Sequence, residues 1–214
     1  MPDSIILKLR DLEIALQSME RTSEHEVSLE SYPTPANIAA AILYAAQMEH
    51  NDIEGKVICD LGCGDGIFAH GAALLGAAQV IGIDLHSKAL KAARRNSSLF
   101  ETAKVNLVLG DVNALTFRMP IDTVVSNPPF GTKKRGADLE FLRKAISIAK
   151  VVYSIHLAGE TNRKFLSDAI RKLGGSVAQI ETFQFPIPKI YEFHRKSKHL
   201  VSVDLYRITI DERE

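Results

Sequence analysis

From residue 56 onward, short apolar runs alternate with longer segments in which apolar residues recur at helical spacing. The runs expected as strands are Val57–Leu61, Val80–Asp84, Asn106–Leu109, Asp122–Ser126 and Val151–His156. The segments expected as helices are Ile67–Leu75, Ser87–Leu99, Leu139–Ala149 and Glu160–Leu173. This alternation is typical of βαβ units, in which helices cover both faces of a mostly parallel sheet. The pattern therefore predicts an α/β fold.

The alternation stops after Gly174 and Gly175. Two further strands are predicted there, Val177–Phe183 and Leu200–Ile210, joined by a connection that contains proline and no helical pattern. Parallel neighbours need a crossover connection, usually a helix, whereas antiparallel neighbours can be joined by a loop. The last pair of strands is therefore predicted to be antiparallel.

Residues 1–50 predict two helices ahead of the sheet. The first helix has one amphipathic stripe, which consists of Ile5, Leu9, Leu12, Leu16 and Met19. We expect this stripe to pack on the chain's own sheet, the alternative being a partner surface. Thr34 is expected as the N-cap, and Pro35 as the first residue, of an alanine-rich helix, Ala36–Met48. We interpret residues 1–50 as a helical extension of the same domain, and residues 51–214 as the part that carries the chemistry.

Composition restricts the class of protein. The 214 residues are 46% hydrophobic and 24% charged with a formal net charge of zero, which argues against a protein that coats nucleic acid. No apolar run reaches the roughly 18 residues of a membrane span, and the N-terminus lacks a signal-peptide pattern. The two cysteines, Cys59 and Cys63, are too few for a disulfide framework and lack metal-ligand partners. These features predict a cytoplasmic protein without a structural metal.

Asn127, Pro128, Pro129 and Phe130 directly follow the predicted strand Asp122–Ser126, and the ends of such strands are where α/β sheets bind ligands. Consecutive prolines fix two φ angles and remove two N–H donors, which leaves a stiff turn with available carbonyls. An asparagine amide and an aromatic ring beside those carbonyls suit a planar group that carries an NH₂, such as a nucleobase edge. The alternative is a rigid loop with a core phenylalanine.

The glycine-rich segment Asp60–Gly66 follows the first strand and opens a helix. Glycines allow a ligand to approach the backbone closely, and a helix N-terminus supplies unpaired N–H groups. Asp84 and Asp111 end the next two predicted strands, where carboxylates can accept ribose hydroxyls and an adenine amino group. The spacing Gly62, Gly64, Gly66 departs from the dinucleotide fingerprint, so we favour S-adenosylmethionine over NAD. Asp60 and Asp65 have structural alternatives: orienting the loop and favouring the helix N-terminus.

Together these segments resemble the class I S-adenosylmethionine-dependent methyltransferases that modify exocyclic or amide nitrogens. The combination of Glu30–Thr34, Asn127–Thr132, Tyr153–His156 and Phe193–Lys196 is similar to the methyltransferase-like family that makes N6-methyladenosine in small-subunit ribosomal RNA, with its archaeal relatives. The resemblance implies a Rossmann-like seven-stranded sheet with an antiparallel last strand. It implies cofactor contacts from Ser31, Thr34, Gly62, Asp65, Ile67, Asp84, Asp111, Val112 and Asn127. Some members of that family also depend on a small zinc-containing activator protein of the Trm112 type that covers an exposed sheet edge, so such a protein is a candidate partner.

Two basic stretches interrupt the neutral average. The first stretch is Lys133, Lys134 and Arg135, and the second contains Arg195, Lys196 and Lys198. Both are candidates for contacts with RNA phosphates, and the alternative is that they are solvated basic turns. His156, at a strand end, is interpreted as a structural histidine. The sequence thus predicts transfer of a methyl group to adenine N6 in RNA, with catalysis by the Asn127–Phe130 turn. The alternatives are guanine N2, a protein glutamine amide, or a non-catalytic scaffold.

Overall fold

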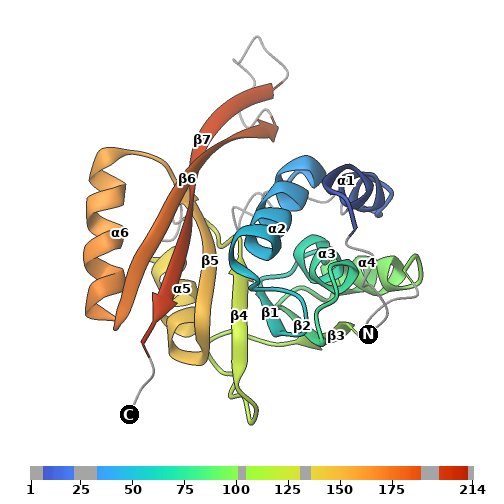
Figure 1. Ribbon diagram of the computed structural model, residues 1–214, viewed down its shortest axis with the longest axis horizontal. Helices are drawn as coiled ribbons and strands as arrows, with labels where there is room; N and C mark the ends of the chain where they lie inside the picture. The colour runs from blue at the N-terminus through green and yellow to red at the C-terminus, as the bar shows by residue number, and fades with distance from the viewer. Residues whose placement is uncertain (1–6, 22–32, 101–104, 131–135, 189–197, 212–214) are drawn as a thin grey trace.

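The computed structural model describes residues 7–21, 33–100, 105–130, 136–188 and 198–211. They form a seven-stranded sheet of order β3-β2-β1-β4-β5-β7-β6 (Figure 1). Strands β1 to β5 are parallel, and β7 is antiparallel to both of its neighbours. The predicted α/β fold with a reversed last strand is confirmed. The strands are β1 (Val57–Leu61), β2 (Gln79–Asp84), β3 (Val105–Leu109), β4 (Ile121–Ser126), β5 (Ala149–Leu157), β6 (Gly175–Pro188) and β7 (Lys198–Ile210).

Helices cover both faces of the sheet, as Figure 1 shows, with α1 to α4 on one side and α5 and α6 on the other. Successive strand residues point to opposite faces. Along β1, Ile58 joins the core with α1, α2 and α3, while Cys59 joins the core with α5 and α6. The helices are α1 (Leu9–Gln17), α2 (Ala36–His50), α3 (Ile67–Leu74), α4 (Ser87–Ser97), α5 (Ala137–Ile148) and α6 (Glu160–Lys172). None of the helices in the described ranges is long and apolar enough to cross a membrane.

The predicted stripe of the first helix packs against the chain's own core. Leu12, Leu16 and Met19 are buried together with residues of α2 and α3. Leu9 is 39% exposed at the start of α1, and Ile5 lies outside the described residues. The stripe therefore packs within the chain, as predicted, but mainly on helices α2 and α3 rather than on the sheet itself.

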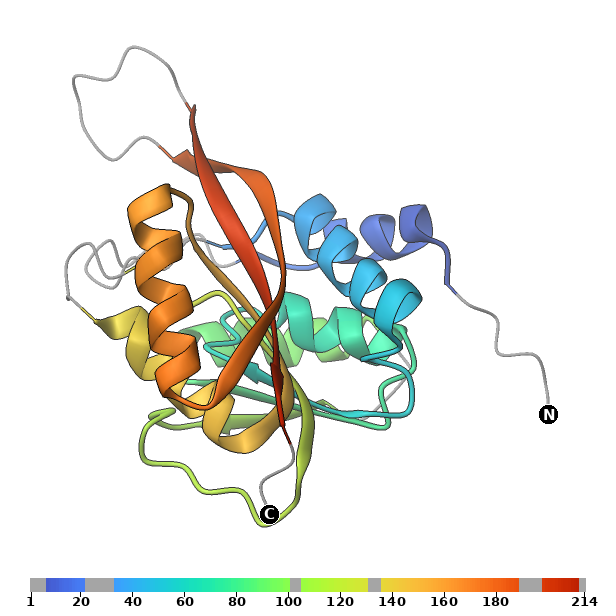
Figure 2. The same ribbon diagram turned by 60° about the vertical axis from the view of Figure 1, so that its left-hand side comes forward.

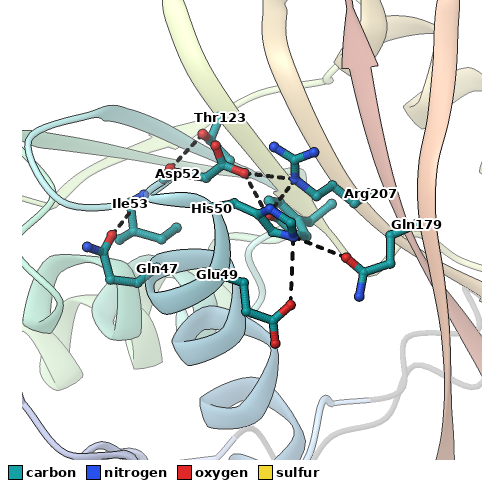
Figure 3. A network of polar contacts seen from close by, with 9 residues as sticks. Gln47, Glu49, His50, Asp52, Ile53, Thr123, Gln179 and Arg207 are labelled. Carbon is teal, nitrogen blue, oxygen red and sulfur yellow. Dashed lines mark hydrogen bonds and ion pairs between the residues drawn. The ribbon is translucent and has the colours of Figure 1, made fainter.

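A polar network fixes the C-terminal end of α2 to the sheet (Figure 3). The Asp52 carbonyl accepts a hydrogen bond from Thr123 Oγ1 on β4 at 2.7 Å. Asp52 Oδ2 accepts from Tyr153 Oη on β5 at 2.7 Å and from Arg207 Nε on β7 at 3.0 Å. Asp52, two residues beyond the end of α2, thus contacts three strands. These contacts set the direction in which α2 crosses the sheet.

Two predictions about element boundaries are wrong. Helix α2 begins at Ala36 with Pro35 as its N-cap and no side-chain cap, so Thr34 does not cap it. The last two strands are longer than predicted, because β6 continues to Pro188 and β7 begins at Lys198. Strand β6 pairs only with β7 and is an edge strand, where a missing N–H is tolerated. The paired β6 and β7 extend beyond the rest of the sheet (Figure 2).

Candidate functional site

The glycine-rich segment and the Asn127 turn meet at one point of the sheet. Strands β1 and β4 are parallel neighbours, although β2 and β3 lie between them in the chain. The chain therefore reverses its direction across the sheet between β1 and β4, which is where open α/β sheets bind ligands. Ser126 Oγ, at the end of β4, donates a hydrogen bond to the carbonyl of Leu61, at the end of β1, at 2.7 Å. This bond holds the two strand ends together.

The turn after β1 presents its backbone. Gly62 and Gly64 have φ angles of 74° and 55°, in the left-handed region that favours glycine. The N–H groups of Gly62 and Cys63 both donate to the carbonyl of Ile83, at 2.8 and 2.9 Å. A Cβ added to Gly64 would meet no atom within 4 Å. The turn is thus anchored on β2 while the backbone at Gly64 has open space beside it.

Acidic side chains lie at adjacent strand ends, as the sequence predicts. Asp84 is buried at the end of β2, where its carboxylate accepts from the N–H groups of Gly64 and His86, each at 2.8 Å. The carbonyl of Asp84 accepts from the N–H of Gly110 at 3.0 Å. The latter bond brings the end of β3 beside Asp84, so that Asp111 follows directly at the same edge.

Asp60 has a contact inside the protein. Its side chain is 1% exposed, and its Oδ2 accepts from the N–H of Ala69 in α3 at 2.9 Å. Burial raises the pKa of Asp60 to about 8; the Ala69 N–H opposes this shift, and the nearby carboxylates of Asp84 and Asp65 add to it. The geometry supports the loop-orienting interpretation of Asp60. A direct cofactor contact from this residue remains a prediction.

Asn127 is held by the segment that precedes α2. Its Nδ2 donates to the Thr34 hydroxyl at 3.1 Å, and Thr34 is 3% exposed. This bond assigns the amide nitrogen to the α2 side and thereby fixes the orientation of the amide. Pro128 is buried, and the partly buried Phe130 packs against the core shared with α1, α2 and α3. The turn is therefore rigid on both sides of its prolines.

Comparison with known proteins identifies the family. A model described as a methyltransferase domain matches residues 52–199. The rRNA N(6)-adenosine-methyltransferase METTL5 of Danio rerio is 36% identical over 207 residues, which cover 95% of this chain and 99% of the relative. The rRNA N(6)-adenosine-methyltransferase Mettl5 of Drosophila melanogaster is 36% identical over 209 residues, which cover 95% of this chain and 97% of the relative. The chain belongs to this methyltransferase family.

Solved structures agree with that assignment. The crystal structure of PH1948 from Pyrococcus horikoshii superposes with a TM-score of 0.86 at 38% identity, covering 95% of this chain and 98% of that chain. The crystal structure of Thermoplasma acidophilum 1320 gives a TM-score of 0.74 at 29% identity, covering 96% and 98%. The class I methyltransferase resemblance predicted from the sequence is confirmed.

Sequence reasoning missed two residues that support the methyltransferase site. Arg21 Nε forms an ion pair with Asp65 Oδ2 at 3.0 Å, and its Nη2 donates to the Thr34 carbonyl at 2.7 Å. Asn96 of α4 is fully buried, and its Nδ2 donates to the Asp65 carbonyl at 3.0 Å. No local motif marks Arg21 or Asn96, because each reaches the turn only through the fold.

A third missed residue had a local signal. Leu85 directly follows Asp84 and is 61% exposed. A large apolar side chain that is exposed in the turn directly after a strand-end acid is a local signal for a ligand-facing position. Ile67 and Val112, which the resemblance implied, are instead 4% and 5% exposed.

The cysteines and His156 are buried, which fits their interpretation as structural residues. Cys59 and Cys63 are free and buried. Burial raises the pKa of both thiols, and the carboxylate of Asp60 adds to the shift, so both thiols are neutral near pH 7. His156 is 1% exposed, with its Nε2 2.9 Å from Ser154 Oγ and its Nδ1 3.6 Å from an Asp138 carboxylate oxygen.

Several predicted site residues fall outside the description of the structure. Lys198 begins β7, but its side chain is not described. The others lie outside the described residues altogether: Ser31, Lys133, Lys134, Arg135, Arg195 and Lys196. Their roles remain predictions.

Proposed function

We propose that this methyltransferase transfers a methyl group from S-adenosylmethionine to N6 of an adenosine in ribosomal RNA. The similarity to rRNA N(6)-adenosine-methyltransferases extends over nearly the whole of both chains. The observation that carries the proposal is the hydrogen bond from Asn127 to Thr34 beside the glycine turn. It presents an oriented amide where the sheet reverses, next to a site suited to a nucleoside.

The described residues fit S-adenosylmethionine. Open space beside Gly64 admits a ligand to the backbone, and the carboxylates of Asp84 and Asp111 suit ribose hydroxyls and an adenine amino group. Arg21 is paired with Asp65, which fits a cofactor without phosphate. When bound, the cofactor supplies an electrophilic methyl group on a sulfonium. The residues proposed to hold it are Ser31, Thr34, Asp60, Gly62, Gly64, Asp65, Ile67, Asp84, Asp111, Val112 and Asn127.

The chain's task is to prepare the nucleophile. The lone pair of adenine N6 is delocalised into the ring, so it is a poor nucleophile in its planar form. Hydrogen bonds from the NH₂ to Asn127 Oδ1 and to the Pro128 carbonyl favour a pyramidal nitrogen with a directed lone pair. Positioning of this kind supplies most of the acceleration, with acceptors placed where positive charge develops.

Phe130 is proposed to stack on the base, and proton removal is proposed to need no side chain of the turn. Stacking of the extruded base on Phe130 contributes about 1–3 kcal/mol, which offsets part of the unstacking cost of a few kcal/mol. The methylated nitrogen is acidic and loses its proton afterwards to water. The protein therefore needs no general base in the turn.

RNA binding is proposed to use the two basic stretches. Lys133, Lys134 and Arg135 directly follow the catalytic turn in the chain, and Arg195, Lys196 and Lys198 lie around the start of β7. Figure 2 shows β6 and β7 extending past the rest of the sheet. Cationic side chains beside a base-binding turn suit RNA phosphates.

A small zinc-containing activator of the Trm112 type is proposed to bind at strand β3. This strand ends the sheet order and has β2 as its one partner in the sheet, and an unpaired strand edge is a template for another chain. Leu109 on β3 is 59% exposed. We also propose that the protein is cytoplasmic. Residues 1–50 are proposed to form a helical extension of the methyltransferase domain that begins at residue 51.

The proposed function can be tested by measuring methyl transfer to total small-subunit rRNA and to total protein. Nucleoside and amino-acid analysis then identifies the methylated product. We expect label from S-adenosylmethionine in N6-methyladenosine. Label in N2-methylguanosine or in a glutamine amide would select another acceptor. Cofactor binding by calorimetry without transfer to either fraction would favour the scaffold. The Asn127→Ala variant serves as the negative control.

A further inference from the structure

Arg21 joins two parts of the site that the sequence keeps apart. Its guanidinium contacts the Asp65 carboxylate in the glycine turn at 3.0 Å and the Thr34 carbonyl at 2.7 Å. The Thr34 hydroxyl in turn accepts from Asn127 Nδ2 at 3.1 Å. A continuous path of polar contacts therefore runs from the methyl-donor side, through Arg21 and Thr34, to the amide that receives the amine.

The backbone beside Arg21 is fixed independently of its side chain. The N–H of Glu20 donates to Asn96 Oδ1 at 2.8 Å, and Asn96 Nδ2 donates to the Glu20 carbonyl at 3.0 Å. The same Asn96 nitrogen reaches the Asp65 carbonyl at 3.0 Å. Asn96 is fully buried, so the end of the first helical segment and the glycine turn share one rigid anchor. Arg21 thus starts from a defined position.

The chemistry of the guanidinium suits this double contact. Nε and Nη2 lie on one edge of a planar fork, so Nε can form the ion pair with Asp65 while Nη2 donates to the Thr34 carbonyl, at fixed relative positions. The ammonium of lysine is a single point charge and does not reproduce this fork. Asp65 is 4% exposed and Thr34 is 3% exposed, so water cannot easily replace either contact.

We propose that Arg21 is a positioning residue that couples occupancy of the glycine turn to the orientation of Asn127. This inference rests on the proposed function for its second half, the acceptor amide. A ligand that fixes Asp65 also fixes Arg21, Thr34 and the Asn127 amide. Coupling between two sites is reciprocal, so disturbing Thr34 weakens the cofactor side as well.

A double-mutant cycle between Arg21→Lys and Thr34→Val tests the coupling. Each single substitution is expected to lower kcat by about 10- to 100-fold through misplacement of the amide, with a smaller change in the KM for RNA. The double variant should be about as slow as the slower single variant. The proposal would be overturned if the loss of kcat in the double variant equalled the product of the two single losses. It would also be overturned if the losses of kcat followed losses of Tm.

Two further variants separate positioning from folding. Glu20→Gln changes only the exposed ion pair with Arg95 and keeps the backbone contacts to Asn96, so its kcat should equal that of the wild type. Added guanidinium ion at low concentration should restore part of the kcat lost in Arg21→Ala and leave Glu20→Gln unaffected. Failure of rescue together with a lowered Tm would assign Arg21 a merely structural role.

The affinity of the same four proteins (wild type, two single variants and the double variant) for S-adenosylmethionine can be measured by calorimetry without RNA. If the wild type makes no N6-methyladenosine, the proposed function fails while this measurement still tests the coupling. We expect the two substitutions to be non-additive in affinity by at least about fivefold. Additive effects in affinity would contradict the coupling whatever the acceptor is.

Discussion

Asp60 is a carboxyl group at the site whose titration has a predictable effect on stability. Its folded pKa is raised to about 8, chiefly by burial, against ~3.9 in an unfolded chain. The folded state therefore binds more protons, and wild-type stability falls as pH rises from about 4 toward 8. Asp60→Asn can keep the acceptor for Ala69 without this loss. Its Tm advantage in cofactor-free protein should grow over that range, and a constant difference would contradict the raised pKa.

Asn127 offers the most direct test at a single residue. Asn127→Ala removes the oriented acceptor, and we expect turnover to fall by about 10²–10³-fold, as when one oriented hydrogen bond to developing charge is lost. Although Asn127 is among the residues proposed to hold the cofactor, cofactor affinity should stay within a few-fold, because the glycine turn and the acids that make most of the proposed contacts are unchanged. Single-turnover transfer and calorimetry measure the two effects. Equal losses in both would assign Asn127 to cofactor binding.

The residues that sequence analysis found differ in kind from those it missed. Gly62, Asp84 and Asn127 lie at strand ends, so local pattern alone marks them as candidates. Arg21 and Asn96 both contact Asp65, which lies 44 and 31 positions away from them in the chain. Only folding brings these residues together, and no local pattern encodes that meeting. Thr34 was selected for a helix cap, but its hydroxyl accepts from Asn127 instead.

At the scale of elements, the contact of α3 with α2 leaves no room at Gly71. A Cβ there would lie 2.4 Å from Leu43 Cδ1 and 3.5 Å from Leu16 Cδ1, and both leucines are fully buried. Gly71→Ala gains up to about 1 kcal/mol in helix propensity, whereas overpacking costs about 1–3 kcal/mol. We expect a net decrease in the free energy of unfolding.

Denaturant unfolding of Gly71→Ala alone and in a Leu43→Val background measures this effect. The smaller valine makes room for the added methyl group, so the cost should be lower in that background. An equal cost in both backgrounds would show that helix α3 itself, rather than its contact with α2, is disturbed.

The elements themselves follow from the sequence where burial dictates them. Strands β1, β2 and β4 are apolar runs because both of their faces are covered, and their bounds were predicted within one residue. Strand β6 was cut short because Pro186 and Pro188 normally end strands. Their positions opposite Leu200 and Lys198 on an edge depend on the order of the sheet, which the local pattern does not contain.

At the scale of the whole molecule, the proposed activator interface at β3 can be tested with a charge. Leu109→Lys places an ammonium group on the exposed edge and should weaken binding of a Trm112-type protein by about tenfold or more. Phe165→Lys is the matched control, since Phe165 is 51% exposed on α6, on the other side of the sheet. Equal effects of the two substitutions would argue against β3.

RNA binding is a property of charge distribution over the molecule. With a net charge of zero, binding must depend on local cations. Replacing Lys133 and Lys134 with alanine should weaken RNA binding and reduce the slope of log K against log salt by about 0.7 for each lost phosphate contact on a single strand. An unaltered slope would favour solvated basic turns.

The position of β7 has a consequence for biosynthesis. This strand is the last in the chain, yet it lies inside the sheet between β5 and β6, and its Arg207 completes the contacts of Asp52. Until β7 has been synthesised, β5 has an open side and β6 lacks the neighbour that it has in the folded sheet. Such open strands are prone to aggregation, so a nascent chain that stalls shortly before residue 198 should depend most strongly on chaperones.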